Sequence, residues 1–431
     1  MKTKNIFLGK KILIYGLGKS GVSSYKFLKN KAKLYLFDDN PKKKLKFNQK
    51  PILFREIQKI DFDIIIISPG IDISKCKLSE FLRKNFLKIY TDLDIFYSFY
   101  KNESITITGT NGKSTTAKIL YDVLLDQKRD VRLIGNIGNP SLSEKKITKN
   151  TIFVIEASSY QLDYSKIFRS KYAIILNISP DHIERHKSLS NYINAKFKLL
   201  ETQSRKSIAY VNKNDQLINK KIKRSNLKQK IYKVDTSIIN KISKQLNNKY
   251  FFSDGYKQNL SFVLKIASKL KLNKKKIIKT LNNFKGLKYR QQIIFNNKNL
   301  TIINDSKSTS FSSSENALKN FDDIYWILGG IPKKGDKFKL SRKECKNFKA
   351  FIFGKHHMQF SKNLKNKIIV KKFANIKVAL KKIFLEIKNQ KNKKNIIFFS
   401  PAGSSFDRFK NFEDRGYYFN QLIKKFIYAK R

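Results

Sequence analysis

A chain of 431 residues is too long for one ordinary hydrophobic core, and its length predicts about three domains. Its two cysteines, Cys76 and Cys345, are too few for a disulfide framework, which favours a reducing, cytoplasmic compartment. No apolar run is long enough to cross a bilayer, so we expect no membrane span, and the basic N-terminal stretch is expected to form a strand and not a signal peptide.

The formal net charge is +60 at pH 7, which alone would indicate a nucleic acid or another anionic partner. The positive residues are mostly lysines, and they are spread through every region of the chain without a basic stripe. We therefore interpret the charge as a solvated lysine surface and expect no specific nucleic-acid partner. Non-specific binding to polyanions is still expected at low salt.

The first element pattern, over residues 11–37, is a strand, a glycine turn, a helix and a second strand. The turn reads GLGKSG over residues 16–21, close to a dinucleotide-binding fingerprint, and Asp38 and Asp39 end the second strand. Binding of NAD is one hypothesis, but Lys19 would crowd the pyrophosphate and no second mononucleotide half follows cleanly. A small α/β domain that holds a phosphorylated ligand is the safer prediction.

The stretch ITITGTNGKSTT, residues 105–116, predicts a short strand, a glycine-rich turn and a helix from Thr115 to about residue 125. Gly109 and Gly112 permit backbone conformations in which successive N–H groups converge on phosphate oxygens. Lys113 adds a positive charge, and Ser114 stands where phosphate-binding loops hold a magnesium ion. The alternative is a glycine turn that merely joins a strand to a helix.

A second apolar strand, within residues 151–162, ends at Glu156 in the stretch EASSYQ. A carboxylate at this end of a strand beside a phosphate loop is well placed to coordinate magnesium. The alternative, a glutamate that caps the next helix, is equally compatible with the sequence alone.

The next strand and helix, over residues 172–203, carry further polar side chains. The strand is followed by Asn177, Asp181, His182 and His186, and polar groups at strand ends of parallel sheets often bind metals or phosphates. On the following helix, residues 189–203, the local pattern alone favours solvated charges for Lys196 and Lys198.

The C-terminal half contains a convincing amphipathic helix over residues 254–272 and then a third α/β unit. Its expected strands lie in residues 300–305, 323–330, 348–354 and 395–400, and polar clusters such as Asp305-Ser306-Lys307 follow them. These strand ends are the expected edge for ligand contacts in an open sheet.

Taken together, the motifs resemble the Mur ligase family. Seven stretches occur in the family's order and spacing, namely GTNGKST, EASSYQL, NISPDHIERH, GLKYR, NDSKSTS, LGG and SPAGSSFDRFKNFEDRG. The stretches NDSKSTS and SPAGSSFDRF resemble those of the family's D-glutamate-adding members. The resemblance spans nearly the whole chain.

The resemblance implies an α/β fold in three domains. These are a Rossmann-like domain over residues 1–91 for the UDP substrate, a central P-loop ATPase-type domain with a parallel or mixed sheet over 92–287, and a Rossmann-like domain over 288–431 for the amino acid. It implies an ATP-dependent amide ligase of peptidoglycan precursor synthesis that joins D-glutamate to UDP-N-acetylmuramoyl-L-alanine through an acyl phosphate. ATP, two Mg²⁺ ions and a carbamylated Lys196 are the implied cofactors, and a cytoplasmic monomer is expected.

The resemblance also implies a role for individual residues of this sequence. The nucleotide-binding residues would be Gly109, Thr110, Asn111, Gly112, Lys113, Ser114, Thr115, Asn259, Arg290 and Asp305. The substrate-binding residues would be Gly16, Leu17, Lys19, Ser20, Asp38, Gly70, Asn136, His182, Thr309, Lys333, Ser405 and Phe412. The metal ligands would be Ser114, Glu156, His182 and Lys196, and the catalytic residues would be Lys113, His182, Lys196 and Lys307.

The sequence departs from the family pattern around the adenine site. Gln258-Asn259 stands where the family commonly has His-Asn, Tyr289 replaces the usual histidine before Arg290, and Gln291 replaces an acidic residue. Lys333 and Lys334 are both available for one glutamate-binding lysine. The alternatives are another Mur-type or folylpolyglutamate-type ligase, or a non-catalytic polyanion-binding protein on a ligase scaffold.

Overall fold

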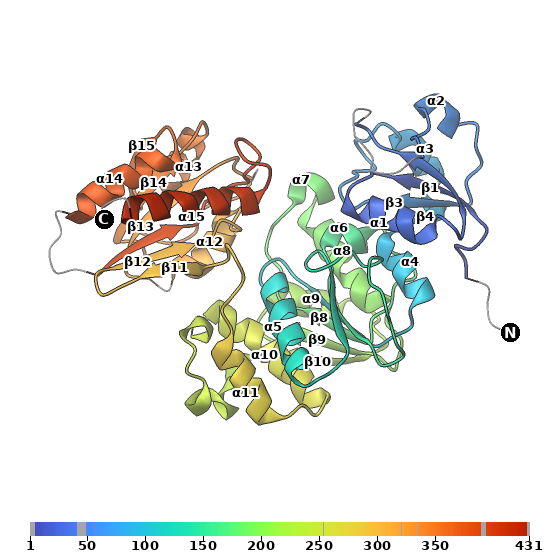
Figure 1. Ribbon diagram of the computed structural model, residues 1–431, viewed down its shortest axis with the longest axis horizontal. Coiled ribbons are helices and arrows are strands. Elements are labelled where there is room, and N and C mark those ends of the chain that lie inside the picture. The colour runs from blue at the N-terminus through green and yellow to red at the C-terminus, as the bar shows by residue number, and fades with distance from the viewer. Residues whose placement is uncertain are drawn as a thin grey trace. The chain divides into compact units, whose positions relative to one another are not determined.

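The computed structural model describes residues 5–40, 49–252, 254–319, 321–333, 335–388 and 394–428. The chain divides into two compact units, and each is described by itself below. Unit 1 comprises Met1–Asn248 with Lys257–Asn283, and unit 2 comprises Lys249–Tyr256 with Phe284–Arg431. The described residues form three sheets, two in unit 1 and one in unit 2 (Figure 1).

The first sheet of unit 1 is parallel, with the strand order β2-β1-β3-β4. Its strands are β1 (Lys11–Tyr15), β2 (Lys33–Phe37), β3 (Ile64–Ile67) and β4 (Ile89–Tyr90). All four isoleucines of β3 are buried, as expected for a strand of a parallel sheet covered on both faces. The accompanying helices are α1 (Lys19–Leu28), α2 (Phe54–Ile57) and α3 (Ser79–Lys84).

The second sheet of unit 1 is parallel as well, with the order β10-β9-β8-β5-β7-β6. The strands are β5 (Ser104–Thr108), β6 (Val131–Gly135), β7 (Ile152–Glu156), β8 (Tyr172–Ile175), β9 (Ile208–Asn212) and β10 (Lys230–Val234). Because β5 lies between β7 and β8, the loops that follow these three strands meet at one edge of the sheet.

Helices surround the second sheet along most of its length. They are α5 (Lys113–Asp126), α6 (Ser159–Asp163), α7 (Ile183–His186), α8 (Leu189–Glu201), α9 (Gln216–Lys223), α10 (Asp254–Lys269) and α11 (Lys274–Asn283). The 16-residue α10 carries an apolar stripe, which agrees with the amphipathic pattern of its sequence. Residues 236–251 contain short 3₁₀ turns, η2 (Thr236–Lys241), η3 (Ser243–Gln245) and η4 (Lys249–Phe251).

A helix between the two sheets of unit 1, α4 (Asp92–Phe99), contributes to a core that they share. Phe96 of α4 packs edge to face against Phe153 of β7, with ring centroids 4.8 Å apart. The buried Asp94 carboxylate accepts hydrogen bonds from the Thr91 amide and from the amides of residues 166–168. These bonds satisfy a fully buried carboxylate and fix the start of α4 on the second sheet.

The sheet of unit 2 has the order β11-β12-β16-β13-β14-β15. Its strands are β11 (Gln292–Asn296), β12 (Leu300–Asn304), β13 (Asp323–Gly329), β14 (Asn347–Phe353), β15 (Ile369–Phe373) and β16 (Asn395–Phe399). β11 pairs with β12 in antiparallel orientation, and the remaining pairs are parallel. β11 is an edge strand that the sequence did not predict.

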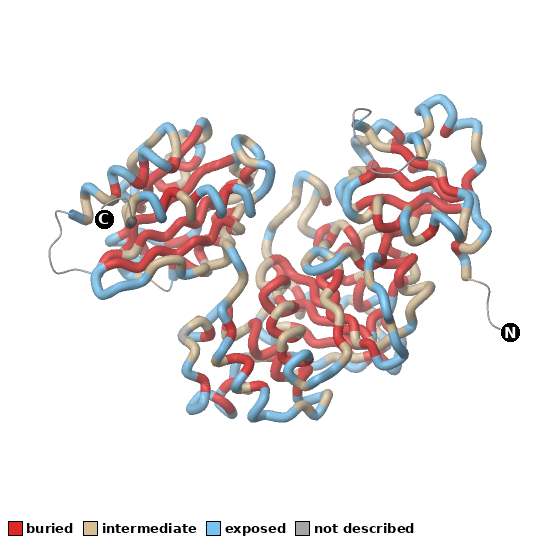
Figure 2. Tube along the Cα trace, viewed as in Figure 1, coloured by how far each residue is buried: buried red, intermediate tan, exposed pale blue. Residues whose placement is uncertain are grey.

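Helices cover both faces of the unit 2 sheet (Figure 1). α12 (Phe311–Leu318) and α13 (His357–Leu364) pack on one core, and α14 (Ile376–Lys388) and α15 (Phe412–Tyr428) pack on the other. Successive residues of the central strands alternate between the cores, as Phe351 and Ile352 do. Figure 2 shows the strands of all three sheets as mostly buried.

The predicted α/β fold, with one sheet in each of three successive regions of the chain, is confirmed. The domain boundaries after residues 91 and 287 stay predictions, although each sheet lies within one of the expected ranges. In the part of the chain that the structure describes, no helix has both the length and the apolar character needed to span a membrane.

Candidate active site

The turn between β5 and α5 has the backbone of a phosphate-binding loop. Gly109 and Gly112 have φ angles of 151° and 83°, which residues with a Cβ rarely adopt. Gly112 is the N-cap of α5, so the positive end of the helix dipole points into the turn. Lys113 Nζ donates hydrogen bonds of 2.8 Å to the carbonyl oxygens of Gly109 and Thr110.

Side chains from α10 and from the loop after β8 hold this turn in place. A Cβ at Gly112 would lie 2.2 Å from Asn259 Oδ1, so only glycine leaves room for the buried Asn259. The Asn111 amide donates to Asn177 Oδ1 at 2.8 Å, and the Thr110 amide donates to the Asn177 carbonyl at 2.9 Å. Thr115, the last predicted residue of the loop, is buried in the first turn of α5.

Glu156 ends β7 beside the phosphate loop, and it is nearly inaccessible to solvent, with 1% of its surface exposed. Ser114 Oγ donates to Glu156 Oε2 at 2.6 Å, and Asn136 Nδ2 donates to Oε1 at 2.9 Å. The structure thus brings three predicted residues together, since Ser114 and Asn136 both bond to the carboxylate of Glu156. Glu156 does not fill the alternative role of helix cap, because Ser158 caps α6.

Lys196 is buried in α8, with 1% of its surface exposed. Its Nζ donates to the Gly109 carbonyl at 2.8 Å and lies 4.4 Å from the centre of the Tyr192 ring. Desolvation, together with the nearby positive charge of Lys113, lowers its pKa well below the usual value. The solvated position favoured by the local sequence pattern is therefore wrong.

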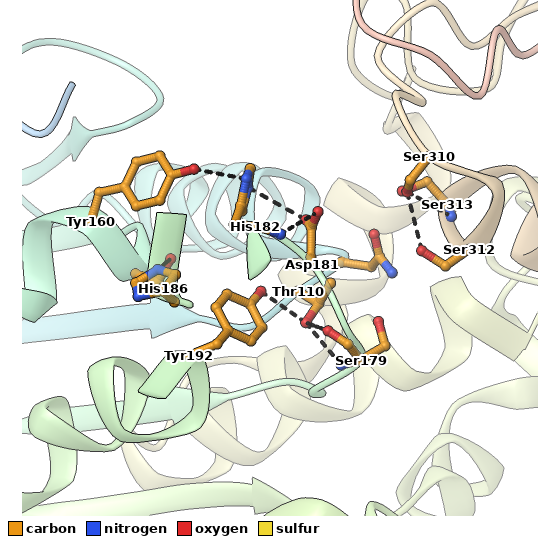
Figure 3. Close-up of polar contacts among 12 residues, drawn as sticks. Thr110, Tyr160, Ser179, Asp181, His182, His186, Tyr192, Ser310, Ser312 and Ser313 are labelled. Carbon is orange, nitrogen blue, oxygen red and sulfur yellow. Dashed lines mark hydrogen bonds and ion pairs between the residues drawn. The ribbon is translucent and has the colours of Figure 1, made fainter. Parts of the chain in front are cut away.

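His182 follows β8 and is the N-cap of α7, with a φ angle of 54°. The Tyr160 hydroxyl lies 2.8 Å from its Nδ1, and Asp181 Oδ2 lies 3.4 Å from its Nε2 (Figure 3). In the same view, Thr110 Oγ1 lies 3.0 Å from the Tyr192 hydroxyl and accepts a bond from the Ser179 amide. The loop after β8 is therefore tied to both α6 and the phosphate loop.

His186, the other histidine of this stretch, has a supporting position. It is buried, its Nε2 lies 3.0 Å from Ser159 Oγ, and its ring packs against Tyr160 and Tyr192. Desolvation, with a contribution from the charge of Arg185, lowers its pKa to about 4. It is therefore neutral near pH 7.

The glycine turn between β1 and α1 is also closely packed. A Cβ at Gly16 would lie 2.8 Å from Ser68 Cβ, and a Cβ at Gly21 would lie 2.0 Å from the Gly16 carbonyl oxygen. The Leu17 amide donates to Asp38 Oδ2 at 2.6 Å. Two further residues predicted for this site, Lys19 and Gly70, are exposed.

Asp92 connects this turn to the second sheet, a role that the sequence did not reveal. It is the first residue of α4, is 3% exposed, and its side chain is hydrogen-bonded by those of Ser20 and Gln161. Ser20 belongs to the first glycine turn and Gln161 to α6, five residues after Glu156. Desolvation raises the pKa of Asp92 to about 6.

In unit 2, Asp305 follows β12 and is buried. Its Oδ2 accepts a hydrogen bond of 3.0 Å from Ser400 Oγ, and its Oδ1 accepts one of 3.1 Å from the Gln291 amide. Desolvation raises its pKa to about 7. Gln291, the departure from an acidic residue, supports Asp305 through its backbone, so its side chain is not needed for that contact.

A cationic and aromatic group lies beside Asp305 in unit 2. Lys307 Nζ lies 4.2 Å from the centre of the Phe412 ring, and the Arg290 guanidinium carbon lies 5.8 Å from it. The Ser306 hydroxyl donates to the Phe412 carbonyl at 2.9 Å. The start of α15 is therefore bound to the loop after β12.

The remaining residues predicted for the amino acid lie on strand-exit loops of unit 2. Ser405 is buried, and Thr309 and Lys333 are half-buried. Lys334, the alternative to Lys333, lies outside the described residues. The sequence did not single out Arg415, which is fully buried beside these loops.

Comparisons with known proteins agree with this arrangement. Residues 107–274 match the model of the Mur ligase middle domain. The chain is 33% identical to UDP-N-acetylmuramoylalanine--D-glutamate ligase of Rickettsia prowazekii, covering 98% of this chain and 99% of that protein. It is 34% identical to the protein of the same name from Buchnera aphidicola subsp. Schizaphis graminum, covering 97% and 99%. The MurF ligase of Thermotoga maritima in complex with ADP has a similar fold, with a TM-score of 0.58 at 14% identity over 98% of this chain and 100% of that chain.

Proposed function

The chain belongs to the Mur ligase family, and from this premise we propose how its residues perform the family's reaction. It is an ATP-dependent amide ligase that joins D-glutamate to UDP-N-acetylmuramoyl-L-alanine and releases ADP and phosphate. Similarity over nearly the full length to ligases of that name supports the substrates. The observation that carries the assignment to the site is the buried set of Ser114, Glu156 and Lys196 around the phosphate loop. Asn136 adds a hydrogen bond to the Glu156 carboxylate.

ATP would bind with its phosphates in the turn of residues 109–114. The Lys113 ammonium would exchange its bonds to the loop carbonyls for bonds to phosphate oxygens, and the N-terminus of α5 would add its dipole. Asn259 lies directly against Gly112, which supports a role near the nucleotide. In unit 2, the buried Asp305 and the neighbouring Arg290 would hold the ribose.

A magnesium ion fits the donor set beside the phosphate loop. The Ser114 hydroxyl and the Glu156 carboxylate supply oxygen ligands, which Mg²⁺ prefers, and they already face one another at 2.6 Å. Among the described residues there is no cluster of three His, Cys, Asp or Glu side chains that could hold a metal. Substrate phosphates and water would therefore complete the shell, and the ion would screen the negative charge of the phosphates.

A second magnesium ion would need a further carboxylate, and Lys196 can provide one as a carbamate. Burial favours the uncharged amine of Lys196, and this is the form whose nitrogen can attack CO₂. A new N–C bond would form and one proton would leave, so that the side chain becomes an anion. His182, held by the Tyr160 hydroxyl at Nδ1, would present its other nitrogen to the same ion or to the acyl substrate.

The reaction requires an activated carboxyl group, because a carboxylate is a poor electrophile. The carboxylate of the L-alanyl group would attack the γ-phosphorus of ATP, forming an acyl phosphate and releasing ADP. The amine of D-glutamate would then attack the carbonyl carbon, lose a proton and expel phosphate. The cations at Lys113 and Lys307 would reduce the repulsion between the approaching anions.

The remaining residues proposed to contact the substrates fall into two groups, one in each unit. In unit 1, the turn with Gly16, Leu17, Lys19 and Ser20, together with Asp38 and Gly70, would hold the UDP group. In unit 2, Thr309, Lys333, Ser405 and Phe412 would bind D-glutamate. We propose that the ligase acts as a monomer in the cytoplasm, which size-exclusion chromatography with light scattering and cell fractionation would test.

A coupled phosphate-release assay with a panel of amino acids tests the proposed function. We expect phosphate release from ATP only when UDP-N-acetylmuramoyl-L-alanine and D-glutamate are both present. Release with L-lysine or meso-diaminopimelate in place of D-glutamate would reassign the chain within the family. No turnover, combined with tight RNA or DNA binding at physiological salt, would support the non-catalytic alternative instead.

A further inference from the structure

Unit 2 contains a buried arginine for which the proposed reaction has no role. Arg415 lies in the first turn of α15, and none of its surface is exposed to solvent. Its Nη2 donates to the Ser306 carbonyl at 2.7 Å, its Nη1 to the Gly403 carbonyl at 2.8 Å, and its Nε to Ser306 Oγ at 3.1 Å. One side chain therefore binds the loop after β12 and the loop after β16.

A third loop lies against the same guanidinium. A Cβ added at Gly330, directly after β13, would lie 3.1 Å from Arg415 Nη1, so the backbone of this loop lies close to the guanidinium. The loop after β13 is also paired with the loop after β16, because the Ile331 amide donates to the Ser404 carbonyl at 2.9 Å and the Ser404 amide donates back at 2.8 Å. Arg415 thus lies behind three loops that follow neighbouring strands.

Each of these loops carries a residue of the proposed D-glutamate site close to its contact with Arg415. Thr309 lies three residues after Ser306, Ser405 lies two residues after Gly403, and Lys333 lies three residues after Gly330. Phe412 is connected as well, because Ser306 Oγ donates to its carbonyl and Arg415 lies one turn after it on α15. A shift of the guanidinium would therefore move several contacts to the amino acid at once.

The charge of Arg415 is not neutralised by its hydrogen-bond partners. All three acceptors, two carbonyl oxygens and one hydroxyl oxygen, are neutral, while Asp305 and Asp407 act on the guanidinium only through space. A buried cation is costly unless it is stabilised, and its field extends further in a protein interior than in water. A positive charge behind these loops favours a ligand with carboxylates in front of them.

We propose that Arg415 is the positioning residue of the amino-acid site: it fixes the three strand-exit loops that carry Thr309, Lys333 and Ser405, and thereby sets the affinity for the dicarboxylate D-glutamate. This inference rests on the function proposed above. It concerns unit 2 alone, so it leads us to expect little change in affinity for the UDP substrate, whose proposed site lies in unit 1.

Steady-state kinetics of Arg415→Lys provides the test, because lysine keeps the charge but cannot reproduce the planar fork of N–H donors. Misplacement of substrate contacts by about 1 Å can cost about 100-fold, so we expect the KM for D-glutamate to rise about 10- to 100-fold. The KM for UDP-N-acetylmuramoyl-L-alanine should stay within about twofold of the wild-type value. Arg408→Lys is the matched control, because Arg408 is an exposed arginine on the same loop as Ser405.

A second variant covers the case in which Arg415→Lys does not fold. Ser306→Ala removes only the acceptor of the Arg415 Nε bond and the donor to Phe412. It should raise the KM for D-glutamate about threefold or more, while the melting temperature falls by on the order of a few degrees and the protein stays folded. If Arg415→Lys folds, its unchanged KM for D-glutamate would overturn the inference. An equal loss of kcat/KM for all three substrates would do the same, because it indicates general destabilisation.

Failure of the proposed function has a different signature. A wild-type protein that shows no saturation with D-glutamate would overturn the reaction and, with it, the role of Arg415. A wild-type protein that saturates normally, beside a folded Ser306→Ala or Arg415→Lys variant with unchanged KM for D-glutamate, would overturn the role of Arg415 alone.

Discussion

The two glycine-rich turns of unit 1 differ in what surrounds them, although both join a buried parallel strand to a helix. The turn after β1 places the Leu17 amide on the Asp38 carboxylate, and its lysine, Lys19, is exposed. In the turn after β5, lysine side chains donate to a backbone carbonyl instead: Lys113 Nζ and Lys196 Nζ both donate to the Gly109 carbonyl oxygen.

This difference indicates different ligands for two similar backbones. In the first turn, the Leu17 amide already donates its hydrogen bond to the Asp38 carboxylate. Fewer N–H groups are therefore available there to bind a highly charged anion. The second turn combines the Lys113 ammonium with the Ser114–Glu156 pair, an arrangement that suits phosphates and a metal ion. The glycine pattern alone could not separate these cases, because the distinguishing side chains come from elsewhere in the sequence.

The largest effect is expected from removing the cation that is specific to the second turn. Lys113→Met should lower kcat about 1,000-fold, because a preorganised charge at the reacting phosphate is lost. Binding of the UDP substrate, measured by isothermal titration calorimetry, should be unchanged. Lys118→Met, one turn later on α5, is the control and should retain activity. Equal losses in both variants would remove the distinction between the turns.

Lys196 tests whether the second turn has a modified lysine. Lys196→Ala should lower kcat about 100-fold, and short carboxylates such as formate or acetate should restore part of the activity by replacing the carbamate. Wild-type protein prepared with ¹³C-bicarbonate should show a carbamate signal by NMR that is missing from Lys196→Ala.

Lys198→Ala is the matched control for this prediction. Lys198 lies on the same helix, is more exposed, and is paired with Asp163 at 3.9 Å. It should keep its activity, and added carboxylates should not affect it. Unchanged activity of Lys196→Ala would rule out the carbamate, and rescue of both variants would show that the carboxylate effect is non-specific.

A smaller effect should follow from a change in the first turn. Asp38→Asn weakens the charge-assisted bond to the Leu17 amide, so we expect the KM for UDP-N-acetylmuramoyl-L-alanine to rise about tenfold with the KM for ATP unchanged. Steady-state kinetics measures both, and Asp61→Asn, an exposed aspartate of the same region, is the control. A rise in the KM for ATP would mean that the first turn serves the nucleotide.

Local sequence patterns predicted most of the fold because apolar runs and turns are local features. These local patterns predicted β5, which leads into the phosphate loop, its neighbour β7, and the amphipathic α10. β11 was missed because it is a half-exposed edge strand whose apolar run, residues 293–295, is only three residues long. Its place in the sheet depends on antiparallel pairing with β12, which no local sequence pattern predicts.

The site residues could be predicted only in part. Lys196 looked solvated, yet Tyr192, Ala195 and Leu199 share its buried helix face, and a lysine on an apolar face is a signal that could have identified it. Asp92 and Arg415 gave no local signal. Their partners, Ser20 and Gln161 for Asp92 and Ser306 and Gly403 for Arg415, come together only through the tertiary fold.

The smallest expected effect concerns the acid response of the groups that support the two turns. Burial lowers the pKa of His186, which packs against Tyr192 behind the second turn, to about 4 from its usual value of 6.5. Between these two pH values the unfolded state binds more protons than the folded state, so stability is full above about pH 6.5 and is lost as the pH falls. Asp92, behind the first turn, has a raised pKa of about 6, which gives the opposite sign.

We therefore expect wild-type protein to lose more stability than His186→Gln when the pH falls from 7 to 6, by on the order of 0.5 to 1 kcal/mol. Relative to Asp92→Asn, wild-type protein should instead gain stability over the same interval, because the folded state then takes up the proton. Urea unfolding at the two pH values measures both differences. If the stability difference from wild type changes in the same direction for both variants, then His186 and Asp92 do not respond oppositely to acid. That result would contradict the assignment of a neutral histidine behind the second turn and a buried carboxyl group with a raised pKa behind the first.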